Sequence, residues 1–127
     1  MNLYVSLGTN DFAKAVTFYD QLFADIGAER SLEEENFVVW SKSSEHSGIS
    51  ITKPYNGQAA TIGNGTMVAI AMDSIEQVNH FYQKALELGA TAQGKPSYKS
   101  SESSYYAAYF RDLDGHKLSA FYIDKNK

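Results

Sequence analysis

The sequence contains no cysteine, and this absence excludes several kinds of chemistry at once. Without a thiol there can be no disulfide, thiolate zinc site, iron–sulfur cluster or cysteine nucleophile. Any bound metal would need histidine, aspartate, glutamate or tyrosine ligands, and the chain has only three histidines.

Long apolar runs and runs of basic residues are also missing. No segment approaches the roughly 18 consecutive apolar residues that cross a bilayer, and the N-terminal MNLYVSLGTND has no basic stretch followed by an apolar one. The net charge is −4, with acidic residues gathered in LEEEN, which offers little to a phosphate backbone. We therefore expect a soluble, cytoplasmic protein with neither nucleic acid nor membrane as a partner.

What the chain does contain is a globular balance of residues and an internal repeat. Its 127 residues, 43% hydrophobic and 20% charged, are typical of one domain that spans residues 1–127. The segment DFAKAVTFYDQLFADIGA, from residue 11, is echoed by SIEQVNHFYQKALELGA, from residue 74. The pair Phe18-Tyr19 thereby matches Phe81-Tyr82, which indicates one fold used twice.

Both repeated segments have the pattern of amphipathic helices. Apolar residues recur at steps of three and four in each, so one face of each helix should be buried. The expected N-caps are Asn10 or Asp11 and Asp73 or Ser74, and the expected stops are Gly27 and Gly89.

Alternating strand patterns surround each helix. Strands are predicted before the helices at 3–7 and 68–72, and after them at 37–41, 48–52, 103–112 and 116–123, with weaker candidates at 28–32 and 90–93. Each half is thus a β-α-β-β-β module, at 1–55 and 65–125, joined by the Gly- and Pro-containing segment 53–65.

A module of about 60 residues hardly buries both faces of its sheet. We expect two sheets to pair, within one chain or between two, and to enclose a cleft.

These segments carry a family resemblance. The "ND" and "FY" of the first helix, FYQKALELGA in the second, and the terminal YYAAYFRDLDGHKLSAF closely resemble the glyoxalase/bleomycin resistance protein/extradiol dioxygenase family, the vicinal oxygen chelate superfamily. The resemblance implies an α+β fold of two tandem βαβββ modules whose curved mixed sheets enclose a cleft, often in a homodimer. Many members bind a divalent metal through His and Glu side chains.

The resemblance also implies where such ligands would stand. The first-strand positions fall on Tyr4 and Met67, and the last-strand positions on Ser50 and Ser119. A phenol, a thioether and two alcohols are not the side chains with which such sites hold Zn²⁺, Ni²⁺, Mn²⁺ or Fe²⁺. We therefore expect no metal, no cofactor and no assigned catalytic residue.

The first functional hypothesis is a protein that has lost the family metal site and binds a small organic ligand in the cleft as a homodimer. Aromatic side chains would supply contact area and hydroxyls would fix the ligand's orientation. The expected ligand-binding residues are Tyr4, Trp40, Ser50, Met67, Tyr105 and Ser119.

Two alternatives stay open. One is a metal-dependent lyase, isomerase or dioxygenase of the glyoxalase type, with a lactoylglutathione lyase-like or dioxygenase-like activity. Its unusual ligand set would be drawn from His46, Glu102, His116 or Tyr4. The other is a non-catalytic dimerisation module. A fold alone does not choose among these functions.

Overall fold

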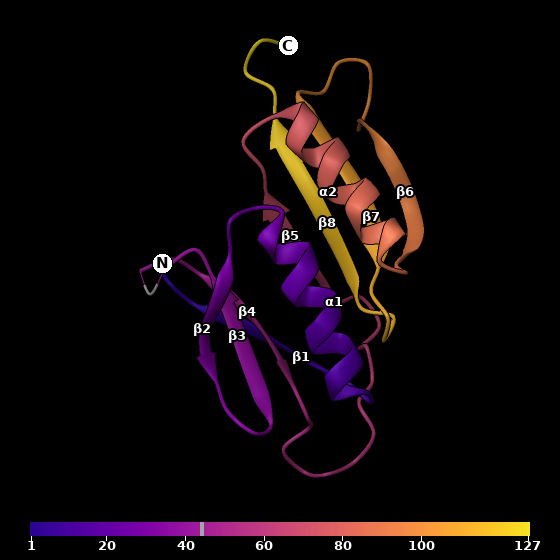
Figure 1. Ribbon diagram of the computed structural model, residues 1–127. Coiled ribbons are helices and arrows are strands. Elements are labelled where there is room, and N and C mark those ends of the chain that lie inside the picture. Colours follow the sequence, from indigo (N-terminus) through magenta and orange to yellow (C-terminus); the bar gives the residue numbers. More distant parts are fainter. Residues whose placement is uncertain (44) are drawn as a thin grey trace. The chain divides into compact units, whose positions relative to one another are not determined.

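The structure is a computed structural model that describes residues 1–43 and 45–127 (Figure 1). It divides into two compact units, Met1–Gly63 and Asn64–Lys127. Each unit has one helix and one four-stranded sheet, and the two repeat the same order of elements. The predicted α+β class and the repeated β-α-β-β-β order are confirmed.

The first unit has the strand order β1-β4-β3-β2, with β1 parallel to β4 and the other neighbours antiparallel. Its elements are β1 (Tyr4–Gly8), α1 (Phe12–Ala24), β2 (Glu29–Glu33), β3 (Phe37–Ser41) and β4 (Gly48–Thr52). The mixed sheet arises because α1 carries the chain across from β1, whereas tight connections join the later strands.

The second unit has the equivalent order β5-β8-β7-β6, again with its first and last strands parallel. Its elements are β5 (Met67–Ala71), α2 (Ile75–Glu87), β6 (Thr91–Tyr98), β7 (Tyr105–Arg111) and β8 (Lys117–Ile123). Neither helix is long and apolar enough to span a membrane, within the residues described.

Each helix begins and ends where the sequence predicts. Asp11 caps α1, its carboxylate accepting the backbone N–H of Lys14 at 3.2 Å, and Ser74 caps α2 by accepting that of Gln77 at 3.0 Å. Gly27 and Gly89 follow the helices with φ of 76° and 110°, a conformation that side chains with a Cβ disfavour.

Each helix buries its apolar stripe against one face of its own sheet. In the first unit Tyr19 and Phe23 of α1 contact the ring of Trp40 on β3, each at a centroid distance of 5.8 Å. In the second unit Phe81 of α2 packs 6.0 Å from Phe110 of β7. We call the other face of each sheet, which its own helix does not cover, the open face.

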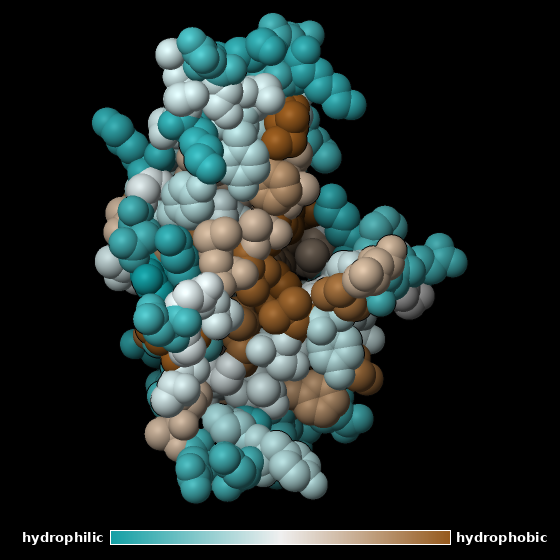
Figure 2. All heavy atoms as spheres, turned by 180° about the vertical axis from the view of Figure 1, so that it is seen from behind, coloured by the Kyte–Doolittle hydropathy of each residue, from teal (hydrophilic) through white to brown (hydrophobic). Residues whose placement is uncertain are grey.

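The open faces hold the residues that lie between the helix-facing ones along each strand. Seen from the side opposite to Figure 1, apolar side chains are exposed among polar ones (Figure 2). Large apolar side chains with more than 40% exposure include Tyr4 on β1, Leu32 on β2 and Met67 on β5.

Candidate functional site

Two serines occupy equivalent positions at the middle of the two open faces. Ser50 on β4 stands in register with Ser6 of β1 and Val39 of β3. Ser119 on β8 stands in register with Ala69 of β5 and Tyr109 of β7. Each serine is the third residue of the last strand of its unit, beside the third residue of the first strand.

Both serine hydroxyls are buried without a hydrogen-bond partner. Ser50 is 1% exposed and Ser119 is 0% exposed, and within the described residues neither Oγ has a donor or an acceptor in reach. Nearly all buried polar side-chain atoms in folded proteins are paired, so such an atom calls for an explanation. An unsatisfied buried hydroxyl costs about 1–3 kcal/mol of folding free energy.

Tyr4 and Met67 occupy the other pair of equivalent positions. Tyr4 begins β1 in register with Gly48, and Met67 begins β5 in register with Lys117. Tyr4 is 57% exposed and Met67 is 42% exposed. Tyr4 thus shares an open face with Ser50, and Met67 shares the other with Ser119.

Trp40 lies on the opposite side of its sheet from Tyr4 and Ser50. Its side chain is 2% exposed, and its Nε1 donates a hydrogen bond of 2.9 Å to Asp20 Oδ1 on α1. The alternation of β3 explains this placement, because Val39 stands beside Ser50 on the open face and its neighbour Trp40 must point toward the helix. Trp40 belongs to the helix-facing core, and the structure does not bring it together with the other predicted residues.

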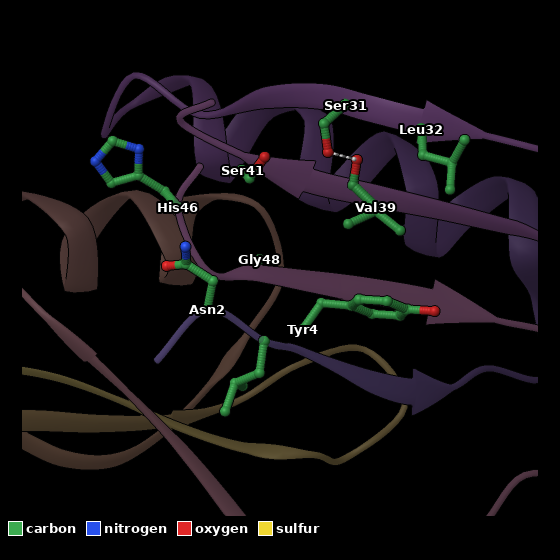
Figure 3. Close-up of a pocket in the computed structure, with 9 residues that line it drawn as sticks. Asn2, Tyr4, Ser31, Leu32, Val39, Ser41, His46 and Gly48 are labelled. Carbon is green, nitrogen blue, oxygen red and sulfur yellow. Dashed lines mark hydrogen bonds between the residues drawn. The ribbon is translucent and has the colours of Figure 1, made fainter. Parts of the chain in front are cut away.

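A pocket of about 300 Å³ lies on the first unit, at the end of the sheet where β1 begins (Figure 3). Tyr4 is the one predicted ligand-binding residue in its wall. The residues around it are Asn2, Leu3, Tyr4, Ser31, Leu32, Val39, Ser41, His46 and Gly48. The wall therefore combines apolar side chains with hydroxyls, an amide and an imidazole, a composition suited to a small organic molecule.

The polar groups at this pocket come from loops and edge strands. Ser31 Oγ on β2 donates to the carbonyl of Val39 at 3.4 Å (Figure 3). His46 Nδ1 lies 2.6 Å from Ser43 Oγ. Sequence reasoning missed Leu32, Val39 and Ser41 as pocket residues. The signal that could have found them is the alternation on β3, extended to its neighbour β2.

A larger hollow of about 760 Å³ lies at the other end of β3 and β4. Its wall includes Glu34 and Glu35 of the β2–β3 connection, Phe37 at the start of β3, Thr52 at the end of β4, and Tyr55. None of the six predicted ligand-binding residues lines it. It is a surface hollow beside the connection between the two units.

The open face of the second unit combines aromatic rings with cations. Tyr105 on β7 stacks on Phe121 of β8, with centroids 5.4 Å apart and an angle of 14° between the rings. Burial, and to a lesser degree the neighbouring Tyr109, raises the pKa of the Tyr105 phenol, so it stays protonated at neutral pH. Lys117 Nζ lies 5.3 Å from the centroid of the Tyr109 ring. This face can offer a planar apolar surface and a positive charge.

The residues at the four family positions do not fit a divalent metal. Tyr4, Met67, Ser50 and Ser119 provide neutral hydroxyls and a thioether, whereas such ions take carboxylate or imidazole ligands. Across residues 1–43 and 45–127, no three histidine or acidic side chains gather closely enough to hold one.

The residues of the alternative ligand set are spread over both units. His46 lies in the pocket wall of the first unit, and Glu102 is exposed in the loop between β6 and β7. His116 is 5% exposed at the turn before β8, where its backbone N–H donates to Asp112 Oδ1 at 2.8 Å. That bond gives the Asp112 carboxylate a structural role in the turn.

Comparison with known proteins places the chain in a family. The model of the Glyoxalase/Bleomycin resistance protein/Dioxygenase superfamily matches residues 3–119. The chain therefore belongs to this superfamily, and the resemblance seen in its sequence is confirmed. No curated protein matches it.

Several solved structures have the same fold as this chain. A glyoxalase/bleomycin resistance protein from Albidiferax ferrireducens T118 is 32% identical, with 94% of this chain and 95% of that chain covered and a TM-score of 0.83. A family enzyme from Burkholderia phytofirmans PsJN is 19% identical over 94% of this chain and 96% of that one, with a TM-score of 0.73. A lactoylglutathione lyase from Agrobacterium tumefaciens is 17% identical over 96% and 92%, with a TM-score of 0.68. The last two similarities establish the fold alone.

Proposed function

We propose that this protein binds a small organic ligand on the open faces of its sheets, without a divalent metal. The observation that supports this most is the pair of buried, unpartnered hydroxyls of Ser50 and Ser119. They stand where the family resemblance places metal-binding carboxylates, and a ligand's polar group would supply the hydrogen bonds that they lack.

The surroundings of the two serines suit binding by contact and orientation. On the first unit, Tyr4 extends the apolar wall of the pocket of about 300 Å³. On the second unit, Met67 and the Tyr105–Phe121 stack present apolar area beside Ser119. Large side chains supply most of the contact area of a ligand site, and a few hydroxyls select the ligand's orientation.

Because each serine Oγ is enclosed by protein atoms, a ligand reaches it only when a neighbouring side chain moves aside. Val39 adjoins Ser50 and Tyr109 adjoins Ser119 in the register of the sheets. Side-chain rotamer changes of this kind are common on binding, while the backbone moves little. The proposed activity is reversible binding and sequestration, with no bond made or broken.

Thermal unfolding in the presence of a chemically diverse small-molecule library tests this function. Chelator-treated wild-type protein should gain several degrees in Tm with a subset of compounds, because a ligand at 100 times its Kd adds about 2.7 kcal/mol to stability. Ser119→Ala should lose much of this gain, whereas Ser101→Ala, at an exposed serine in the loop between β6 and β7, should keep it. A gain that appears only after a divalent metal is added would favour the metal-dependent enzyme instead.

A further inference from the structure

Two cations stand directly opposite each other on the open face of the second unit. Arg111 ends β7 and Lys117 begins β8, and their Cα atoms are paired in the antiparallel register. The next pair along, Phe110 and Leu118, is buried against the helix side, so Arg111 and Lys117 share the open face. Like charges in directly opposed positions destabilise a sheet.

The charges of Arg111 and Lys117 are not matched by salt bridges in the described residues, although the protein has 15 acidic residues and only 11 basic ones. Arg111 donates instead to neutral acceptors, from Nε to Gln93 Oε1 at 2.8 Å and from Nη1 to the carbonyl of Gly115 at 3.1 Å. The nearby Asp112 carboxylate accepts backbone N–H groups of its own turn.

Lys117, the second cation, also forms no salt bridge within the described residues, and its side chain contacts an aromatic ring. Lys117 Nζ rests over the Tyr109 ring, a contact that keeps its full positive charge available to a ligand. Both residues are half-buried, so an anion placed between them would be screened less by solvent than on an exposed surface. Two opposed cations that form no salt bridge within the described residues of an acidic protein point to an anionic ligand.

The rest of this face indicates the kind of anion. Tyr109 adjoins Lys117, and Ser119, with its unpartnered hydroxyl, lies two residues further along β8 in register with Tyr109. The Tyr105–Phe121 stack continues the aromatic surface beyond it. Residues two apart on a strand are separated by about 7 Å, comparable to the length of a small aromatic acid.

We propose that Arg111 and Lys117 bind the carboxylate of a planar aromatic acid, whose ring lies on Tyr109 and leads toward Phe121. The carboxylate draws Lys117 away from the Tyr109 ring and leaves that ring free to stack on the ligand. This assignment rests on the proposed ligand-binding function and names its ligand class.

Calorimetric titration of the full-length, chelator-treated protein with three probes tests the assignment. 2-Naphthoate carries both the ring and the charge, 2-naphthamide keeps the ring without the charge, and acetate keeps the charge without the ring. Naphthoate should bind at least ten-fold more tightly than either of the others, as expected for charge-assisted hydrogen bonds combined with stacking. Its affinity should also fall as salt is raised.

Lys117→Gln, which removes the charge and keeps a polar side chain one atom shorter, should weaken naphthoate binding about ten-fold and leave naphthamide binding unchanged. Lys125→Gln, a matched change at an exposed lysine of the same unit, should alter neither. As a second readout, the ring resonances of Tyr109 should shift when naphthoate is added to the wild type.

Equal binding of naphthoate and naphthamide, or equal effects of the two lysine variants, would overturn the anion site. If library compounds still bind the chelator-treated protein in that case, the proposed function stands and only the ligand class is wrong. If every compound requires added metal, the proposed function itself fails.

Discussion

Ser50 and Ser119 determine what chemistry the open faces can support. A serine hydroxyl is uncharged at every accessible pH and can donate one hydrogen bond and accept others, so it can orient a carbonyl or carboxylate. It cannot replace the charge that a carboxylate brings to a metal. Both hydroxyls are buried without a hydrogen-bond partner among the described residues, so each serine lowers the stability of the fold while leaving a group that a ligand can bind.

Replacement of either serine by alanine should therefore stabilise the ligand-free protein. Ser50→Ala or Ser119→Ala removes an unsatisfied buried oxygen and should raise the free energy of unfolding by about 1 kcal/mol. Urea denaturation of each variant measures this change. Ser6→Ala, on the same face as Ser50 but exposed, should change stability by less than about 0.5 kcal/mol. A loss of stability in both buried variants would show that the hydroxyls already have partners.

Trp40 shows what residue-level reasoning on the sequence could and could not provide. The positions of Tyr4, Ser50, Met67 and Ser119 opposite the helix-facing aliphatics could be predicted, because strict alternation fixes them once the strands are known. Trp40 was predicted from its size and aromatic character alone. Its indole N–H donates a hydrogen bond to Asp20 on the helix. The sequence of the strand alone does not indicate this partner.

At the scale of elements, one carboxylate ties α1 to two strands of its sheet. Asp20 Oδ1 accepts hydrogen bonds from Trp40 Nε1 and from Arg30 Nε, both at 2.9 Å, and Asp20 Oδ2 lies 2.6 Å from Arg30 Nη2. The hydrogen bond from Arg30, assisted by that from Trp40, lowers the pKa of Asp20 below its ordinary value of 3.8. The helix is thereby linked to β2 through Arg30 and to β3 through Trp40.

Asp20→Ala should destabilise the protein by about 2 kcal/mol, chiefly because the buried indole N–H of Trp40 loses its acceptor. Since the folded pKa of Asp20 is lowered, its contribution is complete above about pH 4 and is lost as the pH falls through the folded value. Urea denaturation at several pH values should show a smaller acid-induced loss in the variant than in the wild type.

Glu33→Ala is the control for this change, because it removes the other, more exposed partner of Arg30. A surface ion pair contributes about 0–1 kcal/mol, so this variant should stay close to wild type. If Asp20→Ala proved no more destabilising than Glu33→Ala, the proposed link between the helix and the strands would be unimportant.

The helices and central strands could be predicted from periodicity, but the edge strands only in part. β6 runs over Thr91–Tyr98, whereas the pattern indicated only its first residues at 90–93. Gly94 and Pro96 interrupt the strand pattern, and the register of β6 against β7 shifts between Ala92 and Gly94 and again between Gly94 and Ser97. An edge strand tolerates a proline because its outer N–H groups need no partner. Whether a strand lies at the edge of a sheet depends on the tertiary fold, so the local sequence of β6 does not show it.

At the scale of the whole molecule, the repeat in the sequence corresponds to the repeat in the topology, because each copy folds into one of the two units. The register places Tyr4 and Met67, and likewise Ser50 and Ser119, at equivalent positions of two sheets with the same strand order. The family could be recognised because turn and strand patterns report the fold. The ligand class proposed above could not, because the direct pairing of Arg111 with Lys117 depends on the register between β7 and β8.

We also propose that the protein is a homodimer. The support is the family resemblance, together with exposed apolar side chains on two edge strands, Tyr4 on β1 and Met67 on β5. Sedimentation equilibrium should give twice the chain mass of 14.1 kDa. Tyr4→Lys should shift the equilibrium toward the single chain if β1 lies at the interface. A mass of one chain at all concentrations would contradict the dimer.

The metal content of the protein purified without chelator, measured by elemental analysis, tests the metal-free proposal most directly. With hydroxyls and a thioether at Tyr4, Ser50, Met67 and Ser119, we expect no stoichiometric zinc, nickel, manganese or iron. One equivalent of any of these metals per chain would contradict it and would restore the metal-dependent enzyme as the better description.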